Sequence, residues 1–132
     1  MIIEDSLNCD ASFRTKGGKV MEWQVKDTLT GDLYFVSKIK GGSSNLAEFF
    51  AIIEAMMLQE KEGMNLPIYS DSRIAISWVN KQYCSTWSAD TTEVKSLLDE
   101  YMEWLKTYGH NYEVIKWNTK EWGEIPSDFN RK

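Results

Sequence analysis

The stretch Leu7–Phe13, with the sequence LNCDASF, decides how the chain begins to fold. It is an apolar run interrupted by one acid, which is typical of a strand in the middle of a sheet. The glycines at positions 17 and 18 predict a turn. Lys19–Lys26 then alternates apolar and polar residues with the period of a half-buried strand, and Leu33–Ile39 is a third strand after a second turn. These segments predict an antiparallel meander.

Helices and strands alternate through the rest of the chain. The predicted helices are Asn45–Glu62, Ser72–Lys81 and a stretch from a cap at Asp90 or Thr91 to Tyr108, and the predicted strands are Leu66–Ser70 and Asn111–Trp117. Residues 118–132 predict a loop with at most a short helix. This order predicts an α/β fold with a mixed five-stranded sheet, flanked by helices, in which the two later strands run parallel to the first. In such sheets, sites form outside the carboxyl ends of parallel strands.

Length and composition limit the class of protein. With 132 residues, the chain is predicted to form a single domain over 1–132 and to bury a core without covalent staples. Cys9 and Cys84 lack metal-ligand spacing, which predicts free thiols in a reducing compartment. The acidic start Met1–Asp5 is unlike a signal peptide, and no apolar run has the length of a membrane span. We therefore expect a cytoplasmic protein with no membrane association and no obligate protein partner.

The charge balance bears on nucleic-acid binding. The formal net charge is −5, which counts against affinity based on a broad basic surface. A bound metal would offset part of that charge, and Arg14, Lys16 and Lys19 form a short basic run. Such a run has two interpretations, a local contact for phosphates and an ordinary solvated face.

Four acids lie where strands end or predicted helices and loops begin. They are Asp10 in the first strand, Glu48 in the first turn of the first helix, Asp71 directly after a strand, and Asp128 in the C-terminal tail. Acids gathered at one place require a counter-charge, and hard divalent cations prefer oxygen ligands. The hypothesis is a metal site, provided that the fold brings the four together.

The order of elements and these motifs resemble type 1 ribonuclease H over essentially the whole chain. The resemblance rests on Asp10 in Asp-Ala-Ser, on Glu48, on Asp71 in Tyr-Ser-Asp-Ser, and on the C-terminal acid Asp128. The tail Lys120–Lys132 resembles a short bacterial subgroup whose chains end in a Trp-Gly-Glu-Ile segment followed by an acid. One such motif alone is weak, but four in the right order on the right elements are strong together.

The resemblance implies an endoribonuclease that cuts the RNA strand of RNA–DNA hybrids with two Mg²⁺ ions, for which Mn²⁺ can substitute. The products would carry 3′-hydroxyl and 5′-phosphate ends. Asp10 would bridge the two metals, Glu48 and Asp71 would complete one metal's site, and Asp128 would bind the metal that activates water. Glu124, four residues before Asp128, would tune metal occupancy or product release.

The resemblance also implies which residues contact the substrate. Some would contact the RNA 2′-hydroxyls through the minor groove, which distinguishes RNA from DNA, and others would grip a DNA-strand phosphate. The implied substrate-binding residues are Ser12, Ser43, Ser44, Asn45, Arg73, Ser85 and Thr86. Of these, Ser43, Asn45, Ser85 and Thr86 would form the phosphate pocket.

The sequence departs from the wider family in its basic protrusion, its loop histidine and its C-terminal helix. The long protrusion after the second helix is missing, and the helix at the C-terminus is nearly absent. The single histidine, His110, precedes the last strand and cannot serve in the loop before the last acid. Glu124 or Glu121 would then be the acidic participant from that loop.

Each acid also has an ordinary structural interpretation. Asp10 could accept a local turn hydrogen bond, Glu48 could pair with Asn45 as a capping-box variant, and Asp71 could cap its helix. Asp128 and Glu124 could be solvent-facing charges of a terminus.

Trp122 is expected to pack the tail against the body and so to fix Asp128, which makes the tail the weakest part of the site. Two further functions remain open: a same-fold nuclease with another nucleic-acid substrate, and a non-catalytic nucleic-acid-binding module.

Overall fold

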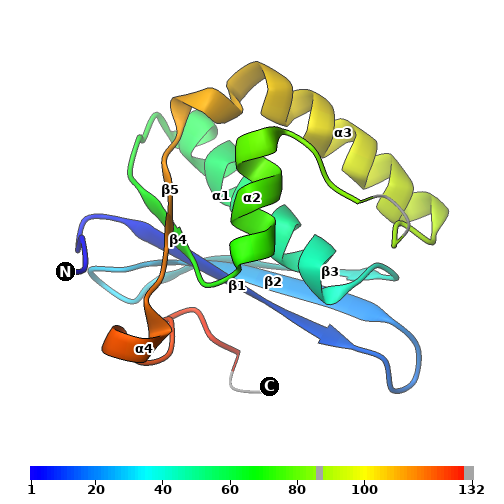
Figure 1. Ribbon diagram of the computed structural model, residues 1–132, viewed down its shortest axis with the longest axis horizontal. Coiled ribbons are helices and arrows are strands. Elements are labelled where there is room, and N and C mark those ends of the chain that lie inside the picture. Colours follow the sequence, from blue (N-terminus) through cyan, green and yellow to red (C-terminus); the bar gives the residue numbers. More distant parts are fainter. Residues whose placement is uncertain (86–87, 130–132) are drawn as a thin grey trace.

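One mixed sheet organises the molecule, which we describe from a computed structural model that covers residues 1–85 and 88–129. The sheet order is β3-β2-β1-β4-β5 (Figure 1). β1 pairs antiparallel with β2 and parallel with β4, β2 pairs antiparallel with β3, and β4 pairs parallel with β5. The strands are β1 (Leu7–Arg14), β2 (Val20–Asp27), β3 (Leu33–Lys40), β4 (Ile68–Ser70) and β5 (Val114–Lys116). The predicted mixed five-stranded sheet is confirmed, and its last two strands are shorter than predicted.

The helices follow the predicted order. They are α1 (Ser44–Glu62), α2 (Arg73–Lys81), α3 (Thr92–Tyr108) with a 3-10 turn at Gly109–Asn111, and the single turn α4 (Thr119–Trp122). No helix in residues 1–85 and 88–129 is long and apolar enough to cross a membrane. Cys9 and Cys84 are buried free thiols, as predicted.

The two faces of the sheet have different coverings. On β1, Leu7, Cys9 and Ala11 belong to the main core with α1, so the alternating residues between them point to the other face. Figure 1 shows α1, α2 and α3 on the first side and α4 with the tail on the other. A small hydrophobic cluster of Tyr69, Trp117 and Ile125 lies against Trp122 of α4. The sheet therefore has one thick core and one thin core, and the tail contributes to the thin core.

Helix caps decide between two interpretations of the acids. Ser43 caps α1, because its Oγ accepts the Leu46 N–H at 3.2 Å. Glu48 lies beyond that cap, so its interpretation as a capping-box residue is wrong. Ser72 caps α2 in the same way, accepting from the Ala75 N–H at 3.1 Å, and Asp71 is therefore not the cap either. Neither Glu48 nor Asp71 is therefore the N-cap residue of its helix.

Candidate metal centre

Three of the four predicted acids gather at one place. One carboxylate oxygen each from Asp10, Glu48 and Asp71 can be chosen so that all lie within 4.8 Å of one another. Asp10 has 0% and Glu48 has 8% of its surface exposed, while Asp71 is half-buried. The site therefore opens to solvent on the side of Asp71.

Sheet topology explains why these residues meet. β1 and β4 are parallel, with Asn8 opposite Tyr69, so the same register continued brings Asp71 opposite Asp10. β4 ends at Ser70, and the chain leaves the sheet just where Asp10 lies on the longer strand β1. α1 packs across β1 and carries Glu48 to the same point. This is the switch point of a mixed sheet, where ligand sites form.

The acid cluster affects the pKa of a neighbouring thiol, that of Cys9. Burial raises the pKa of Cys9 well above its ordinary value, and the charges of Glu48, Asp10 and Asp71 raise it further. The Cys9 thiol donates to the Tyr69 carbonyl oxygen, with a sulfur–oxygen separation of 3.6 Å. An all-oxygen set of acids, two of them buried, fits hard divalent cations such as Mg²⁺ and Mn²⁺.

Asp128 belongs to the C-terminal tail, which is bonded to the strands beside this cluster. Among the residues that the structure describes, the acids within 4.8 Å of one another do not include it. Its neighbour Ser127 is held on both sides: the Ser127 N–H donates to Asn8 Oδ1 at 2.8 Å, and Gln24 Nε2 donates to the Ser127 carbonyl at 2.5 Å. Gln24 is the β2 partner of Asp10. The backbone before Asp128 is therefore fixed beside Asp10.

Aromatic contacts anchor the same tail. The Trp122 ring lies edge-on to Tyr69 and Trp117, with centroid distances of 5.9 and 5.1 Å. Trp117 Nε1 donates to the Gly123 carbonyl at 2.9 Å, and Ile125 is 1% exposed. The expectation that Trp122 packs the tail against the body is confirmed. Glu124, the additional acid predicted near the site, is exposed.

The predicted substrate residues differ in accessibility. Ser44 and Asn45 are exposed in the first turn of α1, and Arg73 is exposed at the start of α2. Ser12 lies beyond Asp10 on the same strand but is only 7% exposed, which leaves little of its side chain for a ligand. These positions put three polar side chains near the acids and one largely out of reach.

One side chain of the predicted phosphate pocket, Ser43, is engaged in hydrogen bonds within the protein. The Ser43 hydroxyl, which caps α1, donates to Ser88 Oγ at 3.1 Å. Ser85 is half-buried in the connection between α2 and α3. Thr86, predicted beside it, lies outside the described residues. The Ser43–Ser88 bond brings this connection against the beginning of α1.

Two residues that anchor the tail were not predicted from the sequence. Asn8 and Gln24 hold the tail that carries Asp128, and both are buried amides, at 0% and 8% exposure. Their signal was a polar residue inside an otherwise buried strand, since buried polar groups need partners. A buried polar residue in a strand indicates that a hydrogen-bond partner exists but does not identify that partner.

No family model matches the chain. It is similar in structure to ribonuclease H1 of the archaeon Halobacterium salinarum, with TM-score 0.54 and 12% identity over 88% of this chain and 86% of that one. A ribonuclease H1 isolated from compost by metagenomics matches with TM-score 0.51 and 15% identity, covering 89% and 87%. A foamy viral protease-reverse transcriptase in complex with RNA/DNA hybrid matches with TM-score 0.54 and 11% identity, covering 90% of this chain and 18% of that one.

The chain has the ribonuclease H-like fold. At these identities the similarity concerns the fold, and the chemistry has to be argued from the acids themselves.

Proposed function

We propose that this chain is an endoribonuclease that hydrolyses the RNA strand of RNA–DNA hybrids with two divalent cations, Mg²⁺ or Mn²⁺. The products would carry 3′-hydroxyl and 5′-phosphate ends. One observation carries the proposal: Asp10, Glu48 and Asp71 come within 4.8 Å of one another at the switch point of a ribonuclease H-like sheet. The foamy viral neighbour in complex with an RNA/DNA hybrid supports the substrate class. The Trp-Gly-Glu-Ile tail supports a place in the short bacterial subgroup of type 1 enzymes.

The roles of the acids follow from how each is held. When bound, two cations would hold the scissile phosphate, activate a water and stabilise the leaving oxygen. Asp10, fully buried in a paired strand, is the proposed ligand of both cations, with Glu48 and Asp71 serving one of them. Asp128 would serve the other from the anchored tail. Glu124, which is exposed in the same tail, would influence metal occupancy or product release.

The substrate contacts are proposed for the exposed polar groups around the acids. Ser44 and Asn45 would meet the RNA 2′-hydroxyls, which only RNA offers. Arg73 would contact the backbone beside Asp71, since guanidinium groups pair well with phosphates. The proposed catalytic unit is residues 1–132, and the two buried free thiols are compatible with the proposed cytoplasmic location.

The proposal is tested by cleavage of end-labelled RNA–DNA hybrid, duplex RNA and duplex DNA, each with Mg²⁺ and with Mn²⁺. Cleavage of the hybrid's RNA strand is expected. Asp71→Asn should fold normally and lose this activity, while Asp99→Asn, an exposed acid on α3, should keep it.

Near wild-type metal-dependent activity in Asp71→Asn would contradict the assignment of the site. Preferential cleavage of another substrate would favour a different nuclease of the same fold. Calorimetric titration without metal uptake would favour a non-catalytic nucleic-acid-binding module.

A further inference from the structure

Four exposed cations gather at the end of the sheet where the β1–β2 hairpin turns. They are Arg14 at the end of β1, Lys16 in the hairpin, and Lys38 and Lys40 at the end of β3. Figure 1 shows this hairpin at the end of the sheet away from α4. We call these four residues the cationic patch.

Three cations of the patch point to the same side of the sheet as Asp10. Side chains alternate along β1, so Arg14 shares the side of Asp10. Residues directly opposite one another on antiparallel strands also share a side, and Arg14 lies opposite Val20, which lies opposite Lys40. Lys38, two positions before Lys40, follows on that side. The patch and the acid cluster are therefore connected by one side of the sheet.

The register also gives the separation of the patch from the acids. Val36 lies opposite Gln24, which lies opposite Asp10, so Lys38 is two strands across and two residues along from Asp10. With strands about 4.8 Å apart and about 3.4 Å per residue, the two backbone positions are about 12 Å apart. Along a duplex, this distance corresponds to about three or four base pairs.

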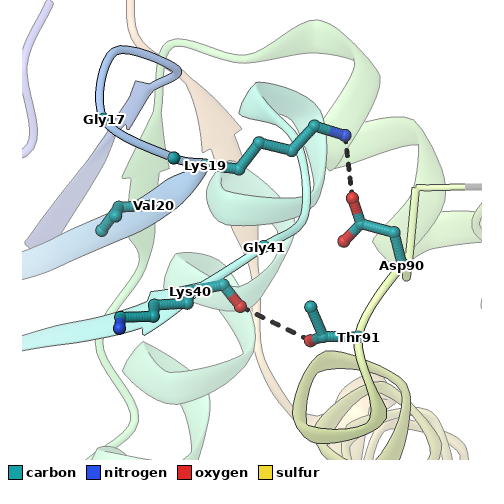
Figure 2. Close-up of a pocket in the computed structure, with 8 residues that line it drawn as sticks. Gly17, Lys19, Val20, Lys40, Gly41, Asp90 and Thr91 are labelled. Atoms are coloured by element: carbon teal, nitrogen blue, oxygen red, sulfur yellow. Dashed lines mark hydrogen bonds and ion pairs between the residues drawn. The ribbon is translucent and has the colours of Figure 1, made fainter.

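The patch contrasts with the charge of the whole chain, which is −5. Within residues 1–85 and 88–129, none of its four cations forms an ion pair with another residue. Lys19 in the same hairpin differs, because its ammonium lies 2.8 Å from Asp90 Oδ2. Figure 2 shows Lys19 directed toward Asp90 and Lys40 directed away from both. Like charges this close repel one another, and a partner with many negative charges would offset that repulsion.

We propose that the cationic patch binds backbone phosphates of a nucleic-acid duplex where it extends beyond the acid cluster. This inference rests on the proposed function, since it assigns a surface to the proposed substrate. A duplex fits because its charges repeat along a line such as that from Asp10 to Lys38, and phosphate contacts give affinity without reading sequence. The basic run of the hairpin is then divided: Arg14 and Lys16 serve the phosphates, whereas Lys19 serves Asp90.

Paired variants test the patch at constant net charge. Lys38→Gln/Lys40→Gln removes two cations of the patch. Its control, Lys61→Gln/Lys106→Gln, removes two exposed cations from the last turns of α1 and α3, which cover the other side of the sheet. Fluorescence anisotropy measures the binding of a labelled RNA–DNA hybrid and of a duplex DNA of equal length, without divalent metal.

The salt dependence of binding carries the result. Each lost phosphate contact lowers the slope of log affinity against log salt by about 0.9, so between about 50 and 200 mM salt the wild type should lose about tenfold more affinity than the patch variant. The control variant should keep the wild-type slope. An unchanged slope in the patch variant would overturn the inference, as would equal changes in both variants, because net charge alone would then explain them. Patch-dependent binding to anionic phospholipid vesicles, with nucleic-acid binding unchanged, would also overturn it.

Cleavage places the patch along the substrate. With Mg²⁺, kcat/KM of the patch variant should be roughly tenfold below that of the wild type at cuts with more than about four base pairs on one side. At cuts nearer to that end of the hybrid, the two proteins should be equal, because the contacted phosphates are missing. A loss of equal size at every cut would contradict the proposed placement.

The two assays separate this inference from the proposed function. Patch-dependent binding by a protein that cleaves no hybrid would support the patch while contradicting the proposed function. Cleavage of hybrids by a protein whose binding does not depend on the patch would overturn the inference and leave the proposed function standing.

Discussion

The candidate metal centre has two halves that are held in place by different kinds of contact. Asp10 and Glu48 lie on long elements at the centre of the main core, an eight-residue strand and a nineteen-residue helix. Asp128 follows a four-residue helix and is held by two hydrogen bonds to Ser127 and the Trp122 contacts. We expect the first half to form whenever the domain folds and the second half to be separable from folding, because few contacts hold the tail. The difference separates variants that disable chemistry from variants that unfold the protein.

The largest effect is expected in the core half. Glu48→Gln should reduce metal-dependent cleavage by at least about a thousandfold, because one charged oxygen ligand is lost. The same change should raise the melting temperature without metal, since it removes one of three adjacent negative charges, two of them buried. Thermal melts with and without Mg²⁺ should show a smaller metal-induced shift in the variant than in the wild type. A lower melting temperature of the variant than of the wild type, both without metal, would indicate that the three carboxylates do not repel one another.

In the tail half, a substitution should lower activity by displacing an acid rather than by removing one. Trp122→Ala removes ring contacts with Tyr69 and Trp117, so activity should fall by roughly ten- to a hundredfold through misplacement of Asp128. Its matched control in the main core is Phe50→Ala. Phe50 is fully buried and lies edge-on to Trp23 and Tyr101, so its truncation should cost about 3–5 kcal/mol of unfolding free energy.

Urea denaturation and kcat/KM, measured on both variants, make the comparison. Trp122→Ala should lose more activity per kcal/mol of lost stability than Phe50→Ala. Equal ratios would mean that the tail and the core fold as one unit.

A smaller effect is expected at the hydrogen bonds that fix Ser127. Asn8→Ala leaves the buried Ser127 N–H without its acceptor, at a cost of about 1–3 kcal/mol. Metal titration by calorimetry should show weakened binding of one of two cations, with the other unchanged. Thr28→Ala is the control, because Thr28 accepts from the same Asn8 amide group at 3.1 Å, whereas the acceptor of the Ser127 N–H is Asn8 Oδ1. Weakening of both cations alike would mean that Asn8 acts on the core half.

The core half could be predicted because its acids lie on or directly after elements with a clear sequence pattern. Asp10 and Glu48 sit on strongly patterned elements, and parallel pairing of the strands places Asp71 opposite Asp10. The restraints on the tail and the bond from the Gly42 amide to Asp90 were not predictable in this way. Asn8–Ser127 and Gly42–Asp90 join residues 119 and 48 positions apart through single side chains. No periodicity marks such a pair, because one side chain and one backbone group suffice to make it.

The smallest expected effect is the pH dependence of the bonds that Asp90 accepts from the Gly42 amide, at 2.9 Å, and from the Lys19 ammonium, at 2.8 Å. The bond from the Gly42 amide, followed by that from Lys19, lowers the pKa of Asp90 below its ordinary value. The folded state thus favours the ionised carboxylate, so its stabilisation is fully present above the ordinary Asp pKa of about 4 and is lost as the pH falls through the lowered value. The difference in unfolding free energy between the wild type and Asp90→Ala should be constant from neutral pH to mildly acidic pH and shrink below that.

Urea denaturation over this range, with Asp99→Ala as the second variant, measures the difference. Because Asp99 is exposed on α3, its variant should follow the wild-type curve in parallel. A difference that grew toward acid would mean that protonated Asp90 is the stabilising form, which is incompatible with the amide and ammonium donors it faces.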